Sequence, residues 1–354
     1  MRVGLTLYGD IDERSGGFRY DQKLLEGLRA AGDTVELVEL RWRRYPRGLL
    51  DNASPRLRDR LDVDVDVMLQ DELAHPSLLR ANRQLPYPIV SIVHHLRASE
   101  SRRLSPFYRA IERRYLGTVD GAVCNSTTTR DIVTGLGVDP GLTAVAPPAG
   151  DQFDPDLDDG TIEHRAQERP LRVVFVGNVT PRKGLKTLVE GLSTADADAE
   201  LTVVGRSADE GYAETVRHCI HREGLADRVD LAGELADGEL ATVLRSSHVL
   251  AVPSRYEGFG IVYLEGMSFG LPAVASRAGG ATDVVTDCET GVLVDPEDSA
   301  AIARALTRFD ADRDLLASMG KAARRRYESH PDWRETTARV RGLLESVAAP
   351  GVVT

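Results

Sequence analysis

Two glutamates with seven residues between them are the densest chemical signal in this 354-residue sequence. Glu257 lies in a glycine-flanked turn, EGFG, which follows the apolar run 249–252, and Glu265 lies in the helix-like segment after the turn. Backbone N–H groups at such a turn can bind an anion or a sugar hydroxyl, and a carboxylate can accept hydrogen bonds from a diol. The alternative interpretation is that Glu257 caps the helix and Glu265 is solvated. The residues that would supply the main-chain groups are Gly258, Phe259, Gly260 and Ile261.

A second signal is the turn PRKG within VGNVTPRKGLKTLVEGL, which places Arg182 and Lys183 between a strand-like run and a helix. Cations at a helix N-terminus add to the positive end of the helix dipole, so this turn suits a diphosphate. Of the 44 Lys and Arg residues, only those at positions 23, 183, 186 and 321 are Lys. A lysine retained in so arginine-rich a chain indicates a need for a compact point charge. We assign Lys183 to the site and interpret Lys186 as an exposed helical residue.

Three further segments of the first half carry candidate residues. The strand end SIVHHL contains His94 and His95, which point in opposite directions if the strand continues, and we favour His94 as functional. The pair Gly16 and Gly17, between the first strand and the first helix, permits close backbone approach to a ligand. The segment 40–50, with four arginines, Trp42 and Tyr45, predicts either contact with an anionic surface or acceptor, or a plain covering face.

Asp62, Asp64 and Asp66 alternate in LDVDVDV, a spacing that resembles the DxD metal motif of the GT-A glycosyltransferases. Alternation also places three side chains on one face of a strand, at its exposed edge or entry. We interpret these aspartates as structural.

The positions of these residues follow from an alternation of strand-like and helix-like segments along the chain, the βαβ pattern of parallel sheets. The pattern breaks at a stretch rich in Pro, Gly and Asp from Pro147 to Pro170, which favours an exposed linker. We therefore predict an α/β protein with two doubly wound, Rossmann-like domains, 1–150 and 171–331, joined by the linker 151–170. A C-terminal helix at about 332–347 is expected to cross back and complete the first domain.

Each predicted domain contains six strand-like runs, and ligands of such sheets bind beyond the carboxyl ends of the strands. The runs are 3–8, 34–40, 63–70, 88–93, 121–125 and 142–146 in the first domain, and 171–177, 200–204, 228–231, 248–252, 272–275 and 291–294 in the second.

These motifs resemble the retaining GT-B glycosyltransferases of the family four, or group 1, type, whose hallmark is a Glu–(seven residues)–Glu pair matched here by Glu257 and Glu265. The resemblance covers essentially the full chain. It implies two domains facing across a cleft, with a nucleotide-sugar donor on the second domain. Glu257 would lie beside the donor sugar, Glu265 would hold the ribose, and the amides of 258–261 would meet the sugar or the phosphate.

The resemblance also implies roles outside the glutamate pair. Arg182 and Lys183 would neutralise the diphosphate, and backbone groups near Leu235 in AGELAD would hold the edge of the base. His94 would be the cleft histidine that contacts the donor sugar and the reacting centre, and Gly16 and Gly17 would lie on the acceptor side.

One departure concerns Asn178, which stands where many members of the family have an arginine that helps to bind the diphosphate. Either Arg182 replaces that arginine, or the diphosphate is held more weakly.

Composition excludes several other classes of protein. A formal net charge of −11 is unsuited to general nucleic-acid binding, which requires a basic surface. No apolar run is long enough to span a membrane, and the N-terminus lacks the pattern of a secretory signal. The three cysteines are widely separated, which predicts neither a disulfide framework nor a metal knuckle. We expect a cytoplasmic protein, with peripheral membrane contact through 40–50 as one further expectation.

The expected activity is transfer of a hexose-type sugar from a nucleoside-diphosphate donor to an acceptor hydroxyl, with retention of configuration and without a metal or another cofactor. The acceptor class stays open between a glycan, a lipid-linked and a small-molecule acceptor, and the base, the sugar and the oligomeric state also stay open. The alternative is a non-catalytic subunit that binds a sugar nucleotide and supports a partner transferase; Asn178 favours it and the intact glutamate pair opposes it. A nicotinamide-dependent enzyme is disfavoured because no GxGxxG follows the first strand of either domain.

Overall fold

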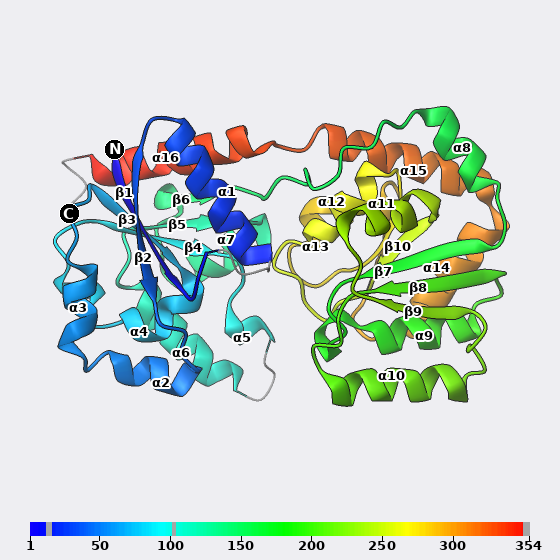
Figure 1. The fold of residues 1–354 in the computed structure, drawn as a ribbon, viewed down its shortest axis with the longest axis horizontal. Coiled ribbons are helices and arrows are strands. Elements are labelled where there is room, and N and C mark those ends of the chain that lie inside the picture. The colour runs from blue at the N-terminus through cyan, green and yellow to red at the C-terminus, as the bar shows by residue number, and fades with distance from the viewer. Residues whose placement is uncertain (12–15, 101–103, 350–354) are drawn as a thin grey trace. The chain divides into compact units, whose positions relative to one another are not determined.

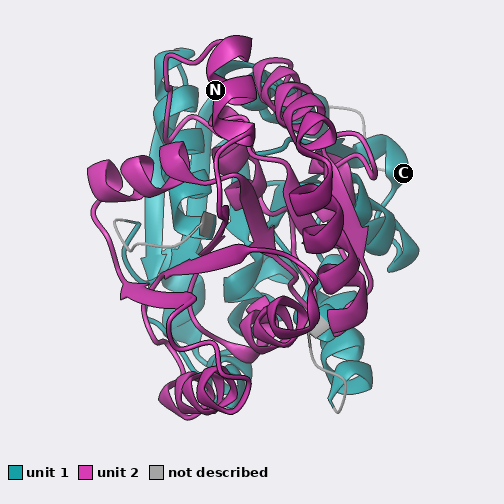
Figure 2. Ribbon diagram, turned by 90° about the vertical axis from the view of Figure 1, so that its right-hand side faces the viewer, with its two compact units in different colours: residues 1–149, 331–354 teal, residues 150–330 magenta. Residues whose placement is uncertain are grey.

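A computed structural model of the chain describes residues 1–11, 16–100 and 104–349. The chain forms two compact units, one from residues 1–149 together with the segment that begins at Pro331, the other from residues 150–330. Figure 2 colours these two units separately. Each unit is built on one six-stranded parallel sheet with helices on both faces, as the sequence predicted (Figure 1).

The sheet of the first unit has the strand order β2-β1-β3-β4-β5-β6. Its strands are β1 (Arg2–Tyr8), β2 (Thr34–Leu40), β3 (Val67–Asp71), β4 (Ile89–Val93), β5 (Gly121–Cys124) and β6 (Thr143–Val145). The helices are α1 (Gly16–Ala30), α2 (Tyr45–Asp51), α3 (Pro55–Leu61), α4 (His75–Leu78), α5 (Arg97–Glu100), α6 (Ser105–Leu116), α7 (Thr127–Gly135) and α16 (Trp333–Ala348), with short 3-10 turns η1 (Glu72–Ala74), η2 (Asn82–Gln84) and η3 (Pro140–Leu142).

Alternate side chains of these strands enter two separate apolar clusters, because successive residues of a strand point to opposite faces. On β3, Val67 and Leu69 join the cluster that α1 and α16 cover, whereas Met68 joins the cluster on the other face. Both faces of the sheet are therefore buried, which explains why its strands read as continuous apolar runs.

The sheet of the second unit has the order β12-β11-β10-β7-β8-β9. Its strands are β7 (Leu171–Val176), β8 (Ala199–Val204), β9 (Val229–Gly233), β10 (Val249–Val252), β11 (Ala273–Ser276) and β12 (Gly291–Val294). The helices are α8 (Asp159–Ala166), α9 (Leu185–Thr194), α10 (Glu210–Arg222), α11 (Asp237–Ser246), α12 (Ile261–Ser268), α13 (Ala281–Val284), α14 (Ser299–Ala311) and α15 (Arg313–Glu328), with the 3-10 turn η4 (Pro181–Lys183) before α9.

The segment 151–170, for which we expected an exposed linker, instead contains α8 and belongs to the second unit. The Asp158 side chain caps α8 by accepting a hydrogen bond from the Thr161 amide (2.7 Å). Arg165 is buried and donates from Nη2 to the carbonyls of Phe269 (2.8 Å) and Gly270 (3.0 Å). The polar, Asp-rich sequence of this segment is typical of a linker. The carbonyl groups that bind Arg165 lie about a hundred residues further along the chain, so the segment alone gave no sign that its arginine is buried.

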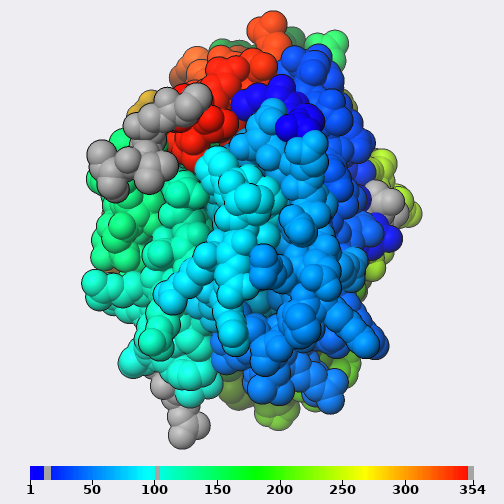
Figure 3. All heavy atoms as spheres, turned by 90° about the vertical axis from the view of Figure 1, so that its left-hand side faces the viewer, coloured from blue at the N-terminus to red at the C-terminus, as the bar shows by residue number. Residues whose placement is uncertain are grey.

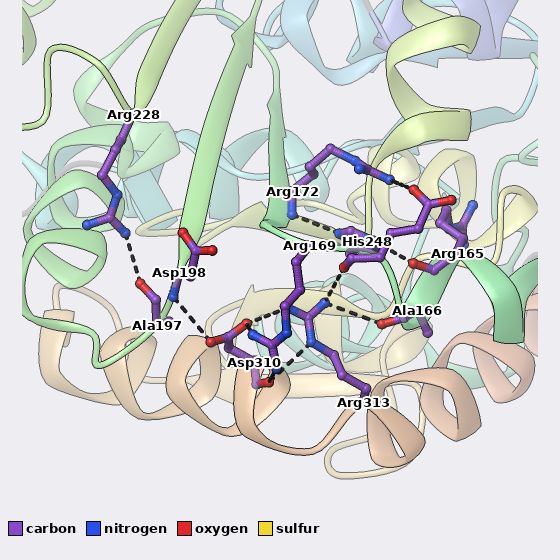
Figure 4. Close-up of polar contacts among 11 residues, drawn as sticks. Arg165, Ala166, Arg169, Arg172, Ala197, Asp198, Arg228, His248, Asp310 and Arg313 are labelled. Carbon is purple, nitrogen blue, oxygen red and sulfur yellow. Dashed lines mark hydrogen bonds and ion pairs between the residues drawn. The ribbon is translucent and has the colours of Figure 1, made fainter.

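Figure 4 shows the polar network around Arg165 at the amino end of the second sheet. His248, just before β10, accepts a hydrogen bond at Nδ1 from the Arg172 amide (2.8 Å), so its Nε2 donates to the Arg165 carbonyl (2.7 Å). Asp310 binds Arg169 (2.9 Å) and Arg313 on the same side of the unit. These contacts join α8, the start of β7 and α15.

The C-terminal helix α16 returns to the first unit, as predicted, and packs on α1, β5 and β6. In the space-filling view of Figure 3 it lies, in red, against the blue start of the chain. Its buried residues Val340, Leu343, Leu344 and Val347 join the apolar cluster of β1, β3 and α1. None of the helices in the described part of the chain has the length and apolar character needed to cross a bilayer.

Candidate active site

The two C-terminal motifs meet because their strands are neighbours in the second sheet. β10 pairs with β7 in parallel, while β8 lies on the other side of β7, so the chain changes direction across the sheet at this point. Loops at such a switch point diverge and leave room for a ligand at the carboxyl ends of the strands. The loop after β7 carries Lys183, and the loop after β10 carries Glu257.

Glu257 is 6% exposed and is surrounded by donors. Its Oε1 accepts hydrogen bonds from Lys183 Nζ (2.5 Å) and Ser254 Oγ (2.7 Å), and its Oε2 lies 3.3 Å from Arg182 Nη1. Burial opposes ionisation of this carboxyl, but the charges of Lys183 and Arg182 outweigh it and lower the pKa of Glu257 to about 2. Glu257 is therefore an ionised, buried carboxylate at neutral pH.

Main-chain contacts hold the Lys183 and Glu257 loops together. The Arg255 amide donates to the Arg182 carbonyl (2.7 Å), and the Gly280 amide donates to the Glu257 carbonyl (2.8 Å). Gly184 and Gly279 have φ angles of +73° and +86°, and a Cβ on either residue would lie about 2 Å from a neighbouring carbonyl oxygen. The close approach of these segments thus depends on glycine at both positions.

The residues between Glu257 and α12 occupy the places that the sequence predicted. Gly260 directly precedes the helix, and Ile261 is its first residue. Phe259 is buried, with its ring 5.8 Å from that of His330. Gly258 is half-buried. The alternative interpretation of Glu257 as a helix cap is wrong, because no side chain caps α12 and the carboxylate is engaged by Lys183.

Glu265 lies in the second turn of α12 and is only 8% exposed. The helix is buried along most of its length, so the alternative interpretation of Glu265 as a solvated helical residue is also wrong. Lys186, by contrast, forms an i,i+4 ion pair with Glu190 (2.5 Å) on the surface of α9, as we expected of an exposed lysine.

Leu235 lies between β9 and α11, is half-buried and packs on the apolar core of the second unit. A cavity of about 140 Å³ opens nearby at the carboxyl ends of β8 and β9. Leu235 does not line this cavity; among the residues that do are Val179, Gly205, Ser207, Arg217, Leu231 and Gly233.

In the first unit, His94 directly follows β4 and is 8% exposed. Its ring packs edge-on against Tyr20 at a centroid distance of 5.0 Å, and a Cβ on Gly17 would lie 3.4 Å from His94 Cδ2. Gly16 and Gly17 are the first two residues of α1. His94 Nε2 lies 3.4 Å from Asp21 Oδ1. In this structure the imidazole therefore faces a carboxylate.

Three buried acids that the sequence analysis did not single out surround His94. Asp21 lies on α1, Asp71 ends β3, and Glu72 begins η1. Burial raises the pKa of Asp21 to about 8; burial and the nearby Asp21 raise the pKa of Asp71 to about 6. Burial lowers the pKa of His94, so the ring is neutral near pH 7. Glu72 accepts hydrogen bonds from the amides of His94 (3.0 Å) and His95 (3.5 Å).

The sequence did contain a signal for these acids. Asp21 stands at a position of α1 that shares the apolar face of Leu24, Leu25 and Leu28, where a charged residue is unusual. Asp71 and Glu72 follow the apolar run of β3 directly, at the sheet edge that binds ligands.

Two candidates of the sequence analysis remain, the aspartates before β3 and the segment 40–50, which follows the carboxyl end of β2. Asp64 and Asp66 precede β3, at its amino end, and both bind Arg2, with 3.1 Å between Asp66 Oδ1 and Arg2 Nη2. These ion pairs support the structural interpretation of Asp64 and Asp66. In the segment 40–50, Trp42 is 52% exposed, although its ring contacts those of Tyr8 and Phe18. Membrane contact through this segment stays a prediction.

Comparison with solved structures supports the class of protein that two doubly wound sheets define, the GT-B fold. Sucrose-phosphate synthase from Thermosynechococcus elongatus superposes with a TM-score of 0.83 at 22% identity, covering 99% of this chain and 100% of the other. Anabaena Alr3699/HepE, solved with UDP and glucose, gives 0.78 at 18% identity, covering 98% and 100%.

Two family models match most of the chain: Glycosyltransferase Family 4 over residues 17–151 and Glycosyl transferases group 1 over residues 161–326. The chain belongs to this glycosyltransferase family.

Curated relatives have more specific names. A GDP-mannose-dependent alpha-(1-6)-phosphatidylinositol monomannoside mannosyltransferase of Mycobacterium tuberculosis is 34% identical over 191 residues, which is 51% of this chain and 49% of that protein. A D-inositol 3-phosphate glycosyltransferase of Salinispora arenicola is 32% identical over 298 residues, 75% of this chain and 65% of that protein. The chain spans about half the length of the first of these relatives.

Proposed function

We propose that the protein is a retaining glycosyltransferase that moves a hexose-type sugar from a nucleoside-diphosphate donor to an acceptor hydroxyl. The observation that carries this proposal is the cluster of Lys183, Arg182 and Glu257 at the switch point of the second sheet. Two positive charges against one carboxylate leave a net positive site, which suits a diphosphate. The names of the relatives support the donor class, since one is GDP-mannose-dependent and one structure contains UDP.

The chemistry proposed for this site follows from its charges. Cleavage of the donor leaves negative charge on the diphosphate, which Lys183, Arg182 and the amides before α12 would stabilise. The donor carbon gains oxocarbenium character, and the ionised Glu257 would stabilise it without forming a covalent bond. Attack from the face of the leaving group retains the configuration, and the departing phosphate can accept the proton of the acceptor. Because two side-chain cations serve the diphosphate, no metal is proposed there.

Further assignments complete the proposal. Glu265 would bind the ribose, and backbone groups near Leu235 would hold the base. On the first unit, His94 would act at the reacting centre and Gly16 and Gly17 on the acceptor side. The acceptor class stays open between a glycan, a lipid-linked and a small-molecule acceptor.

The proposal is tested by donor binding and turnover in matched variants. Lys183→Ala should weaken nucleoside-diphosphate binding about 10–100-fold, because a hydrogen bond to a charged group contributes about 1.5–3 kcal/mol. Glu257→Gln should lower transfer by orders of magnitude while the diphosphate still binds. Lys186→Ala, on the surface of α9, is the control and should change neither quantity. Calorimetry with GDP and UDP gives the affinities, and NMR of the product gives the anomeric configuration.

A non-catalytic subunit that binds a sugar nucleotide is the second candidate, and the exposed Asn178 favours it. Against it, Arg182 reaches Glu257 from four residues further along the chain and is placed to replace the missing cation. Release of free sugar from a donor by the purified wild-type chain, lost in Glu257→Gln, would support the enzyme. Tight diphosphate binding without any turnover of a donor panel would support the subunit.

A further inference from the structure

An arginine lies against two tyrosine rings at the carboxyl edge of the first sheet. Arg97 begins α5, in the segment that follows β4, and Tyr108 lies in the first turn of α6. Tyr45 begins α2, in the segment that follows β2. Ligands of parallel sheets bind at this edge. We propose that Arg97 binds an oxyanion, a phosphate or a carboxylate group, that the acceptor carries. The role of the acceptor rests on the proposed function, whereas the anion site itself does not.

The two tyrosines hold the guanidinium group by their ring faces. Arg97 Cζ lies 5.2 Å from the centroid of the Tyr45 ring and 5.0 Å from the centroid of the Tyr108 ring. A cation over an aromatic face is attracted by the quadrupole of the ring. The two rings contact each other edge to face, with 4.8 Å between their centroids. Stacking leaves the N–H groups at the edge of the guanidinium open, and these groups can bind a carboxylate or a phosphate through two parallel hydrogen bonds.

A buried histidine fixes the orientation of Tyr45. His75 Nδ1 lies 2.6 Å from the carbonyl oxygen of Glu72, so Nδ1 donates this hydrogen bond. Nε2 of the neutral ring is then an acceptor, and the Tyr45 hydroxyl donates to it (2.9 Å). Burial lowers the pKa of His75 to about 4, so the ring is neutral near pH 7. Side chains that are fixed before a ligand arrives lose less conformational freedom when they bind it.

The charge of Arg97 is available to a ligand. In the part of the chain that the structure describes, its side chain forms no ion pair and donates no hydrogen bond, and the residue is exposed. The buried acid of α6, Glu112, accepts a hydrogen bond from the Ala98 amide (3.1 Å). Burial raises the pKa of Glu112, an effect that the more distant charge of Arg97 does not reverse. Glu112 thus differs from Glu257, whose pKa is lowered by two adjacent cations.

The surroundings of Arg97 carry the same sign of charge. Arg109 follows Tyr108 on α6, and Arg41 and Arg44 precede α2; all three arginines are exposed. The sole acid within α6 is the buried Glu112. This local excess of arginine runs against the formal net charge of −11 for the whole chain. A positive surface raises the local concentration of an anionic substrate.

Binding of oxyanions to the purified full chain tests the site without any donor. The probes are inorganic phosphate, glucose 6-phosphate and glucuronate, with glucose as the neutral counterpart, and calorimetry gives the affinities. We expect at least one of the two charged sugars to bind more tightly than glucose, and the tighter of the two identifies the group that the site prefers. Equal affinities for glucose and both charged sugars would overturn the proposal. Phosphate binding that is lost in Lys183→Ala and kept in Arg97→Gln would also overturn it.

Variants locate the bound group. Arg97→Gln should weaken binding of the preferred charged sugar about 10–100-fold, as expected for loss of a hydrogen bond to a charged group. Arg97→Lys keeps the charge but not the planar fork, so it should restore only part of this affinity. The control is Arg113→Gln, an exposed residue in the last turn of α6, which changes the net charge equally and should bind as the wild type does. Equal losses in Arg97→Gln and Arg113→Gln would mean that only the general charge matters and would overturn the assignment.

Transfer assays distinguish this proposal from the proposed function. For a charged acceptor, Arg97→Gln should raise the acceptor KM and leave the donor KM unchanged; an unchanged acceptor KM would overturn the role of Arg97 in acceptor binding. Failure of a nucleoside diphosphate to bind would contradict the proposed function alone, because oxyanion binding at Arg97 does not require it. Arg97-dependent binding of phosphatidylglycerol vesicles without binding of any soluble probe would assign the arginine to a lipid surface and overturn the proposal.

Discussion

Lys183 and Glu257 show how one contact can depend on two distant motifs. Each residue was predicted as part of the site from its own motif, but the resemblance placed Lys183 on the diphosphate and Glu257 beside the sugar. In the structure Lys183 Nζ lies 2.5 Å from Glu257 Oε1. A bound diphosphate would compete with Glu257 for Lys183, so the ion pair would keep the ammonium in place until the donor arrives.

The ionisation of Glu257 makes stability depend on pH in a defined window. Its pKa is lowered to about 2 from the ordinary 4.5, so the folded state binds this proton more weakly than the unfolded state does. The stabilisation is fully present above pH 4.5 and is lost as the pH falls toward 2. The difference in unfolding free energy between wild type and Glu257→Gln should therefore shrink from pH 5 to pH 3, as measured by urea denaturation.

A lysine variant provides the control for this measurement. In a Lys183→Met background the main source of the low pKa is absent, so the effect of Glu257→Gln should depend much less on pH. If the unfolding free energies of the wild type and Glu257→Gln changed in parallel between pH 5 and pH 3, the assignment of an ionised, paired carboxylate would be contradicted.

The residues that cluster in the second unit were visible in the sequence, whereas the acids around His94 in the first unit were not. Glu257, Arg182 and Lys183 stand in glycine-containing turns that are visible in the sequence, and Glu265 follows Glu257 at a fixed spacing in the next helix. Asp21 was missed because a single acid within a helical repeat gives no indication of what the neighbouring strands bring to it. Its partners lie about fifty and seventy residues away, which only the strand order β1-β3-β4 brings close.

At the scale of elements, all twelve strands were predicted, because strands buried on both faces are continuous apolar runs. The start of β3 was wrong by several residues. Val63 and Val65 alternate with aspartates like strand residues, but their amides donate to the carbonyls two residues earlier, Leu61 and Val63, and pair with no neighbouring strand. Hydrophobic periodicity alone cannot distinguish a strand that pairs in the sheet from an extended segment that does not.

The loop that carries Glu257 depends on a close approach to Gly279. Gly279→Ala should destabilise the protein by more than the cost of a left-handed alanine, about 1–2 kcal/mol, because its Cβ would lie 2.0 Å from the Glu257 carbonyl oxygen. The variant should also weaken diphosphate binding by displacing Glu257 and Lys183. Chemical denaturation and calorimetry measure the two effects.

Gly224→Ala is the matched control for that experiment. Gly224 has a similar φ of +68°, but a Cβ there would meet nothing within 4 Å. This variant should show the conformational cost alone, with unchanged diphosphate binding. Equal destabilisation by both substitutions would mean that the approach of Gly279 to Glu257 is not sterically required.

At the scale of the whole molecule, the first unit is discontinuous in sequence and the second is continuous. Leu344→Ala in α16 should destabilise the first unit by about 2–5 kcal/mol, because Leu344 is fully buried in its apolar cluster. Hydrogen exchange should accelerate in α1, β5 and β6, while the second unit keeps its protection.

A second substitution in α16 is expected to increase stability and serves as the control. Gly342 is exposed, and a Cβ there would meet nothing, so Gly342→Ala should stabilise the helix by about 1 kcal/mol. Loss of protection in the second unit after Leu344→Ala would show that the two units unfold together.

The return of α16 also sets an order of maturation on the ribosome. Residues 1–149 are synthesised first, yet the helix that covers one face of their sheet is made only after the entire second unit. The continuous second unit can fold while translation proceeds, but the first must wait with part of its apolar surface uncovered. During that interval chaperones can bind the exposed apolar surface. The first unit therefore completes its folding after the second unit, although most of its residues are translated earlier.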